Sequence, residues 1–467
     1  MGNVLFLFTN DLRLDDNQAL ASINHDDSIL PVFIYDASFY TKPLGQASKV
    51  WLHHSLIDLK QICTSLSFYK GSILEIVPLL VKKFSFEQVV VSEQFFPHEK
   101  SVIDQLRSIL SSLRCQFSVI NTSLLWHPRE ILKSDQTPYK VFTPFFRNGC
   151  LNAKDPYVTS TLATRDYCFD SDSVCLESFD LLPDHGWGKS VSSHWDISSK
   201  GLDHVRNDFF QKKILSYKQG RDFPSFNSVS CLSPYIRFGN VSIHSIWYQA
   251  NQLTPSENLD HFLSELGWRE FSYYLVYHFP HIVNTNFRTK FDQFPWIFNQ
   301  LSFDAWKTGF TGYPIVDAGM RELWQTGYMH NRIRMIVGSF LVKNLLIDWR
   351  YGESWFWDCL FDADLASNTA SWQWVAGCGA DAAPYFRIFN PVTQGQKFDP
   401  NGDYTLRFIP ELKNLPKTYL FSPWEAPLDL LRELNITLGK TYPKPIVDLR
   451  DSRERALAAF QSLKGLS

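Results

Sequence analysis

The stretch Asp-Ala-Asp-Leu-Ala-Ser-Asn-Thr-Ala-Ser-Trp-Gln-Trp, residues 362–374, places two carboxylates, an amide and two indoles close together. On a helix, Trp372 and Trp374 would point in nearly opposite directions, whereas on a strand they would share a face. One indole can then wall a pocket while the other, with Trp349 and Trp296, joins a row of rings that carries an electron inward. For any single Trp, the alternative is a ring that only fills the core.

Length, composition and charge describe a globular protein of more than one domain. A chain of 467 residues is too long for one compact core, and 45% hydrophobic with 20% charged residues is ordinary for globular proteins. The formal net charge of -3 gives no overall attraction to nucleic acid. Any DNA site must therefore be a local basic patch.

Cysteine spacing and the N-terminus bear on compartment and metal binding. The eight cysteines form no CxxC pair and no Cys/His metal spacing, which predicts free thiols, a reducing compartment and no metal site. The first residues lack the basic start and cleavage site of a signal peptide, and no apolar run is long enough to span a membrane. We expect a cytoplasmic protein without membrane contact.

Strand-like and helical patterns alternate in the first part of the chain. Residues 4–8, 30–35 and 89–91 are short apolar runs, and residues 48–66 and 100–113 carry apolar side chains at helical spacing. This alternation predicts an α/β domain with a parallel, Rossmann-like sheet over residues 1–130. No GxGxxG follows the first strand, so dinucleotide binding is not indicated in this domain.

The remainder of the chain divides into a connector and a helical domain. The periodic pattern dissolves into Asp, Ser, Gly and Pro from about residue 150, and we place an interdomain connector at 131–205. An all-α domain is expected at 206–467, with helices predicted at 256–277, 304–326 and 329–348.

Two helical segments combine residue types that suit a nucleotide or a base. Glu265, Trp268 and Arg269 share one helix face, where they can bind a flat polar ring beside a phosphate, or form a surface ion pair next to a packed indole. Asn331 and Met335 lie one turn apart, and the Asn amide offers a donor and an acceptor to a base edge. An internal polar network is an equal alternative for this second segment.

Further polar residues are compatible with a bound dinucleotide of flavin type. Asp362 and Asp364 can hold ribose hydroxyls or pair with Arg334, and Asn368 can offer its amide to a ring nitrogen. Residues 228–235 gather hydroxyls beside a proline, as at helix starts whose N–H groups receive phosphate. Each motif alone is also explained by caps or ion pairs.

A series of motifs resembles, in order along nearly the whole chain, the photolyase/cryptochrome family, and most closely its class I cyclobutane pyrimidine dimer (CPD) photolyases. The motifs are DLRLDDN (11–17), GRDFP (220–224), LSPY (232–235), WREF (268–271), TGYPIVDA (311–318), NRIRM (331–335) and DAAPYFRIFNP (381–391). The resemblance implies FAD in the helical domain. The residues implied to bind it are Tyr217, Val229, Ser230, Cys231, Leu232, Ser233, Arg334, Asp362, Ala363, Asp364 and Asn368.

The resemblance also implies a lesion pocket and an electron relay. Catalytic positions would be Glu265, Asn331, Met335, Asn368 and Trp374. DNA would be bound by Arg221, Glu265, Trp268, Arg269, Asn331, Arg332, Trp374, Arg387 and Gln394. Trp296, Trp349 and Trp372 would carry electrons inward when light reduces the flavin.

The implied function is light-driven electron transfer from reduced FAD to a CPD flipped out of UV-damaged DNA, by a monomeric enzyme. The alternative is a cryptochrome-type blue-light receptor without repair activity. Asn368, where cryptochromes often carry Asp or Cys, and the end of the chain at Ser467 favour repair. A (6-4) photolyase would place His where Asn331 and Met335 stand.

This sequence also departs from the family pattern. Val229 and Cys231 replace the usual Thr and Arg near the flavin phosphates, and Phe96 stands where folate-binding relatives place an acid. A second, antenna chromophore therefore stays open between methenyltetrahydrofolate, a deazaflavin and none.

Overall fold

A computed structural model describes residues 2–157, 165–183, 186–385 and 387–463. They form two compact units. The first comprises residues 1–214, 230–280 and 361–366, and the second comprises 215–229, 281–360 and 367–467. The boundaries predicted at residues 130 and 205 stay predictions.

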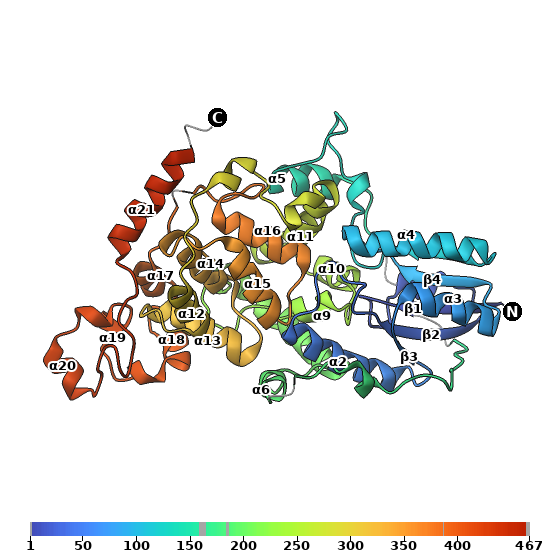
Figure 1. Ribbon diagram of the computed structural model, residues 1–467, viewed down its shortest axis with the longest axis horizontal. Helices are drawn as coiled ribbons and strands as arrows, with labels where there is room; N and C mark the ends of the chain where they lie inside the picture. Colours follow the sequence, from blue (N-terminus) through green and yellow to red (C-terminus); the bar gives the residue numbers. More distant parts are fainter. Residues whose placement is uncertain (1, 158–164, 184–185, 386, 464–467) are drawn as a thin grey trace. The chain divides into compact units, whose positions relative to one another are not determined.

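A parallel sheet is the centre of the first unit (Figure 1). Its strands are β1 (Asn3–Phe8), β2 (Ser28–Tyr35), β3 (Ser67–Lys70), β4 (Gln88–Ser92) and β5 (Gln116–Ile120). Their order is β3-β2-β1-β4-β5, with Val4 opposite both Ile29 and Gln88. The predicted α/β domain with a Rossmann-like sheet is confirmed. The order in which successive strands are added reverses between β1 and β4, and ligands of such folds bind at this reversal point.

Apolar side chains fix the helices on the sheet. Leu5 and Leu7 of β1 belong to a buried core that also includes Val77 of α3 (Ile73–Phe84) and Leu106 of α4 (Pro97–Ser112). In Figure 1, α2 (Gln46–Ile62) lies on the opposite side of the sheet from α4. A sheet buried on both faces explains why β1 and β2 are continuous apolar runs.

The rest of the first unit is helical apart from its connecting segments. Its further helices are α1 (Gln18–Ala21), α5 (Phe142–Pro144), the π-helix η2 (Phe145–Gly149), α6 (Trp187–Ser192), α7 (Ser199–Gln211), α9 (Ser233–Arg237), α10 (Ile243–Asn251) and α11 (Glu257–His278). α11 begins at the N-cap Ser256, whose side chain accepts a hydrogen bond from the Leu259 N–H.

The second unit is built from helices. They are α8 (Tyr217–Gly220), α12 (Gln300–Thr308), α13 (Pro314–Thr326), α14 (Asn331–Ser339), the π-helix η8 (Phe340–Asn344), α15 (Trp349–Cys359), α17 (Pro391–Phe398), α18 (Asp403–Phe408), α19 (Lys417–Leu420), α20 (Leu428–Glu433) and α21 (Leu449–Ser462). α16 (Leu365–Ala376) starts in the first unit and continues here. The all-α C-terminal fold class is confirmed.

One predicted helix is interrupted and another is shorter than predicted. The helix predicted at 304–326 is wrong as one element, because Gly309 ends α12 in the left-handed region (φ 69°) and Pro314 starts α13. The helix predicted at 329–348 is present as α14 followed directly by η8, so it ends at Asn344, before α15 begins at Trp349. Within the described part of the chain, no helix has both the length and the apolar character needed to cross a membrane.

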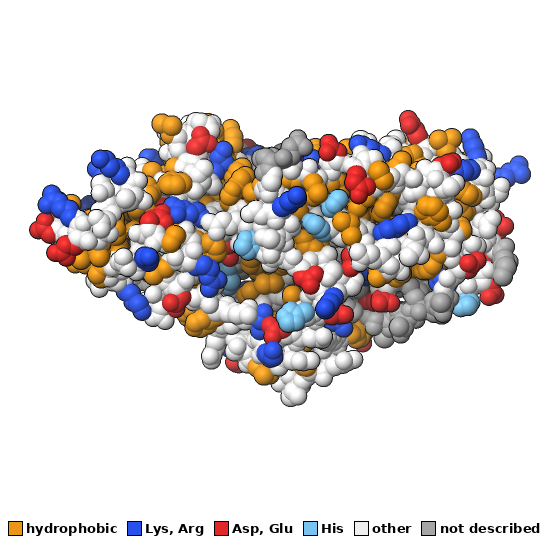
Figure 2. Space-filling model, turned by 90° about the horizontal axis from the view of Figure 1, so that it is seen from below, with side chains coloured by type: hydrophobic (Ala, Val, Ile, Leu, Met, Phe, Trp, Pro, Cys, Tyr) orange, Lys and Arg blue, Asp and Glu red, His pale blue; other side chains and the backbone are white. Residues whose placement is uncertain are grey.

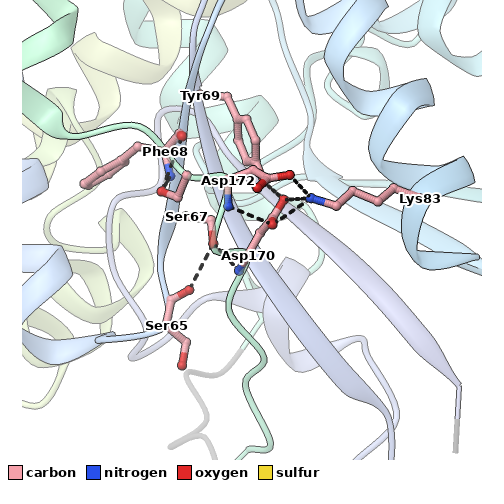
Figure 3. A network of polar contacts seen from close by, with 8 residues as sticks. Ser65, Ser67, Phe68, Tyr69, Lys83, Asp170 and Asp172 are labelled. Carbon is pink, nitrogen blue, oxygen red and sulfur yellow. Dashed lines mark hydrogen bonds and ion pairs between the residues drawn. The ribbon is translucent and has the colours of Figure 1, made fainter.

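A polar network fastens part of the connector to the sheet edge (Figure 3). The Asp170 side chain is only 2% exposed; its carboxylate accepts hydrogen bonds from Lys83 Nζ at 2.8 Å and from the Tyr69 hydroxyl. Val174 N–H donates to the Phe68 carbonyl of β3 at 2.9 Å. The connector therefore covers backbone groups that an edge strand would otherwise expose.

We predict that Asp170→Asn lowers the free energy of unfolding of this unit by about 1–3 kcal/mol. Burial opposes ionisation of Asp170, but the bonds from Lys83 and Tyr69 outweigh it and hold the pKa below 3.8. This stabilisation is present above pH 3.8 and is lost as the pH falls through the lower folded-state pKa. Thermal unfolding at pH 7 and pH 3 measures it.

The control is Asp172→Asn, because Asp172 also pairs with Lys83 but its side chain is 72% exposed. An exposed pair contributes at most about 1 kcal/mol. Equal losses in the two variants would contradict the role given to the buried carboxylate.

Candidate functional site

The predicted face of α11 exists in the structure and carries an aromatic stack. Glu265 and Trp268 are both partly buried. The Trp268 indole stacks on Phe142, with ring centroids 3.8 Å apart and planes inclined by 11°. Glu265 thus lies one turn from an indole whose plane is set by a residue of the predicted connector.

Arg269, on the same helix, pairs inside the protein. Its Nη1 donates to Glu270 Oε1 at 2.9 Å, and its guanidinium lies 4.8 Å from the centre of the Tyr273 ring. The Tyr273 hydroxyl donates to Asp364 Oδ2 at 2.5 Å. The positive charge of Arg269 is therefore balanced within the protein.

Glu270 ties α11 to the chain that leaves the sheet. Its Oε2 accepts hydrogen bonds from the backbone N–H groups of Leu125 at 2.9 Å and Trp126 at 3.5 Å. Burial raises the pKa of Glu270 to about 7, while Arg269 and these N–H groups act in the opposite direction.

A small polar cavity lies in the first unit. It is lined among others by Asn10, Arg13, Thr122, Ser123 and Arg269. Asn10 follows β1 and Thr122 follows β5, so the cavity lies at the carboxyl ends of parallel strands. The Arg13 guanidinium donates to the carbonyls of Asp16, Thr122 and Gly239. It thus helps to fix these segments.

Two sets of predicted cofactor residues meet within the first unit. The Ser233 hydroxyl donates to Asp362 Oδ2 at 2.7 Å, and Arg237 Nε donates to the Ala363 carbonyl at 2.9 Å. Cys231 adopts the left-handed region (φ 53°), which turns the chain between Ser230 and the buried Leu232. Residues 230–233 and 362–364 are thus joined by the Ser233–Asp362 hydrogen bond.

In the second unit, α14 presents the predicted base-contacting residues. Asn331 is exposed and Met335 is partly buried. Arg332 Nη2 pairs with Asp222 Oδ1 at 2.7 Å, and its guanidinium lies 4.3 Å from the centre of the Phe398 ring. Arg334 Nε donates to the Met329 carbonyl at 2.7 Å. One arginine is therefore oriented at the surface while the other holds the start of the helix.

The Asn368 side chain is oriented by α15. Its Nδ2 donates to the Glu353 carbonyl and to Glu353 Oε1, both at 3.0 Å. Because both partners are acceptors, the amide nitrogen must face Glu353 and Oδ1 must point elsewhere. No described residue donates a hydrogen bond to Oδ1, so it can accept one from a ligand.

Of the predicted relay residues, Trp372 packs on the face of α15 that carries Trp349. Trp349 is 1% exposed and its indole N–H donates to Asn286 Oδ1 at 2.9 Å. A Cβ on Gly352, one turn after Trp349, would meet the Trp372 ring at 2.2 Å. Trp372 therefore lies against α15 beside the Trp349 turn.

Trp296 and Trp374 are less buried than the inner pair. Both indoles are partly exposed. Next to Trp296, the Ile297 N–H donates to the Leu346 carbonyl at 2.9 Å, which joins this segment to the chain entering α15. Trp374 is on α16, where its neighbour Trp372 is only 3% exposed.

The remaining predicted residues are spread over the second unit. Tyr217 is buried with the Arg221 guanidinium 5.6 Å from its ring centre, Val229 and Gln394 are partly buried, and Arg387 is exposed. The Arg387 carbonyl accepts a hydrogen bond from the buried Lys343 Nζ at 2.9 Å. On the face drawn in Figure 2, Lys and Arg are interspersed with Asp and Glu.

Comparison with known proteins identifies this arrangement. Residues 4–161 match the family model "DNA photolyase", and residues 262–462 match "FAD binding domain of DNA photolyase". The deoxyribodipyrimidine photo-lyase of Agrobacterium fabrum is 42% identical over 99% of this chain and 98% of its own length. The chain belongs to the photolyase/cryptochrome family.

Other members of the photolyase/cryptochrome family are similar over the whole chain as well. The crystal structure of a bacterial class III photolyase from Agrobacterium tumefaciens has a TM-score of 0.94 at 41% identity, covering 100% of this chain and 98% of that one. Cryptochrome-2 of Arabidopsis thaliana is 33% identical over 96% of this chain and 77% of its own length. The expected FAD-binding domain is confirmed, whereas the expected resemblance to class I is not.

Sequence reasoning missed the residues that orient the site of this photolyase family member. Glu353 orients Asn368, Asp222 orients Arg332, and Tyr273 donates to Asp364. The partners of the last two pairs are 110 and 91 positions apart, so no spacing pattern connects them. Glu353 is 15 positions from Asn368 but on another helix.

We predict that His330→Asn reduces the loss of stability in acid. His330 Nδ1 accepts a hydrogen bond from the Arg332 N–H at 3.2 Å and caps α14, and Asn can provide the same cap. Burial lowers the pKa of His330 from 6.5 to about 4. Its contribution to stability is complete above pH 6.5 and is lost as the pH falls towards 4, a loss of about 3 kcal/mol.

Urea unfolding of both proteins at pH 7.5 and at pH 4.5 measures this difference. At pH 7.5 the variant is expected to be somewhat less stable, because Asn leaves part of the buried ring volume empty. An unchanged acid-induced loss in the variant would show that His330 is not its source.

Proposed function

We propose that this protein is a deoxyribodipyrimidine photo-lyase that splits cyclobutane pyrimidine dimers in UV-damaged DNA. The observation that carries the proposal is the orientation of Asn368, which leaves an amide oxygen free to accept a hydrogen bond. In the family, Asn at this position faces flavin N5 in photolyases, and a cryptochrome often has Asp or Cys there. An amide fixed by Glu353 cannot take the place of an acid in proton transfer.

The residues of the site fit FAD in chemistry. The hydrogen-bonded pair Ser233 and Asp362 suits ribose hydroxyls, and no described residue donates a hydrogen bond to Asn368 Oδ1. We assign FAD binding to these residues together with Tyr217, Val229, Ser230, Cys231, Leu232, Arg334, Ala363 and Asp364. When bound and reduced, FAD supplies the light-excited electron that splits the dimer.

The protein then has to bind and orient the lesion and exclude water from it. A dimer stacks and pairs poorly, so turning it out of the duplex costs less than extruding normal bases. We assign stacking on the dimer to Trp268 and Trp374, and polar contacts to Glu265 and Asn331, with Met335 against the pyrimidine rings.

Binding of the DNA phosphates requires local positive charge, because the net charge of the protein is negative. We assign phosphate contacts to Arg221, Arg332 and Arg387, with Gln394 nearby in sequence. Asp222 holds the Arg332 guanidinium in one direction, which reduces the entropy lost on binding. Arg269, whose guanidinium pairs with Glu270, keeps its proposed place among the DNA contacts.

We assign the electron path for light-driven flavin reduction to three tryptophans, running from Trp296 through Trp349 to Trp372. The packing of Trp372 against α15 next to the Trp349 turn supports the inner step. The backbone hydrogen bond between Ile297 and Leu346 supports the outer step, from Trp296 to Trp349. The relay serves photoreduction, and the repair step itself does not need it.

We propose that this enzyme is a class III photolyase. The motifs resemble class I, but the similarity to a solved class III photolyase supports class III. A photoreceptor without repair activity is the second candidate, which the similarity to a plant cryptochrome supports. The antenna chromophore and a monomeric state stay predictions.

We expect the purified, reduced protein to repair dimers in near-UV or blue light and not in darkness. The measurement uses DNA with a single defined CPD, and it follows the loss of the dimer by chromatography. Dimers that persist equally in light and darkness, in a protein that carries FAD, would favour the photoreceptor.

We further expect two Trp variants to separate binding from photoreduction. Trp374→Ala should weaken lesion binding about tenfold or more, because stacking on a base contributes about 1–3 kcal/mol. Trp296→Phe should slow photoreduction of oxidised flavin but leave repair by chemically reduced protein unchanged. If each variant damaged both activities equally, the separate roles would be refuted.

A further inference from the structure

One face of the Trp268 indole is already covered by another residue of the chain. The Phe142 ring lies parallel to it, with centroids 3.8 Å apart and planes at 11°. Phe142 is 8% exposed, whereas Trp268 is partly exposed. A ligand therefore has access only to the part of the indole that Phe142 leaves open.

A third ring continues this stack into the core. Phe146 lies parallel to Phe142, with centroids 5.6 Å apart and planes at 10°. Phe146 is 2% exposed and approaches α11 at Gly267, where an added Cβ would come within 2.6 Å of its ring. Glycine weakens a helix interior, so its presence here permits the close approach of the aromatic segment.

The stack fixes the indole in a way that a lone side chain would not achieve. A partly exposed Trp on a helix can change rotamer, and a ligand that needs one rotamer loses affinity when the side chain must first be ordered. Parallel rings on the buried side favour a single plane for the indole. Trp268 is thereby oriented before any ligand binds.

We propose that Phe142 is a positioning residue for lesion recognition, holding the Trp268 indole in the plane that receives the pyrimidine dimer. The inference rests on the proposed function, and it extends the DNA site into the predicted connector at residues 131–205. Phe142 itself stays on the far side of the indole and does not touch the DNA.

The test is the dark affinity of reduced protein for an oligonucleotide with one CPD, measured by fluorescence anisotropy. Phe142→Leu keeps an apolar side chain but removes the stacked ring, and it should weaken binding about threefold to tenfold. Phe142→Tyr should restore wild-type affinity. With lesion at saturation, repair per absorbed photon should equal that of the wild type, because the bound dimer and the flavin are unchanged.

Phe145→Leu is the matched control. Phe145 is also 2% exposed and belongs to the same segment, but it packs on Phe271 and Tyr274, at centroid distances of 5.1 and 4.6 Å. It should leave lesion affinity unchanged if the protein remains folded by circular dichroism. Equal weakening in the Phe142 and Phe145 variants would assign the effect to packing of the segment and overturn the proposal.

Two further results separate this inference from the proposed function. A wild-type protein that neither prefers nor repairs the CPD oligonucleotide refutes the proposed function itself. A wild-type protein that repairs, with Trp268→Leu defective but Phe142→Leu equal to wild type, refutes only the role of Phe142. A lower repair yield in lesion-saturated Phe142→Leu would likewise contradict a role confined to binding.

Discussion

A buried carboxylate must find a hydrogen-bond donor for each of its oxygens, and Glu270 finds them on two segments of the first unit. One oxygen pairs with Arg269 on its own helix, and the other accepts the backbone N–H groups of Leu125 and Trp126. α11 is thereby fixed in rotation against the chain leaving β5. Because Glu265 and Trp268 are within about one and a half turns of Glu270, their directions are fixed as well. A helix held only by apolar contacts would tolerate small rotations that this pairing does not.

Most of the architecture could be predicted from periodicity, and the failures have physical causes. The central strands β1, β2 and β4 were predicted because burial on both faces makes them continuous apolar runs. β3 and β5 are the two edge strands, and both have partly exposed residues, which weakens the apolar signal. The break between α12 and α13 was marked by Gly309 and Pro314, but apolar spacing continued across it and concealed the interruption.

The candidate site was predictable in its residue types but not in its geometry. Asn331, Arg332 and Asn368 could be selected by motif resemblance. Which atom of each side chain is available could not, because this depends on tertiary partners such as Asp222 and Glu353. The sequence does not determine which way the Asn368 amide points, and in the structure the contacts with Glu353 do. The stacking of Phe142 could not be predicted for the same reason, because only the fold brings its ring onto Trp268.

The two tryptophans of α16 illustrate how helix geometry separates functions that the sequence places side by side. Asn368 and Trp372 are four positions apart and therefore share one face. Both meet α15 at neighbouring residues: Asn368 bonds to Glu353, and the Trp372 ring packs against Gly352. Trp374 lies two positions further, on another side of the helix. In the proposed relay, an electron at Trp372 would thus reach the helix face that carries the proposed flavin contact. Trp374 would line the proposed lesion pocket without extending that relay.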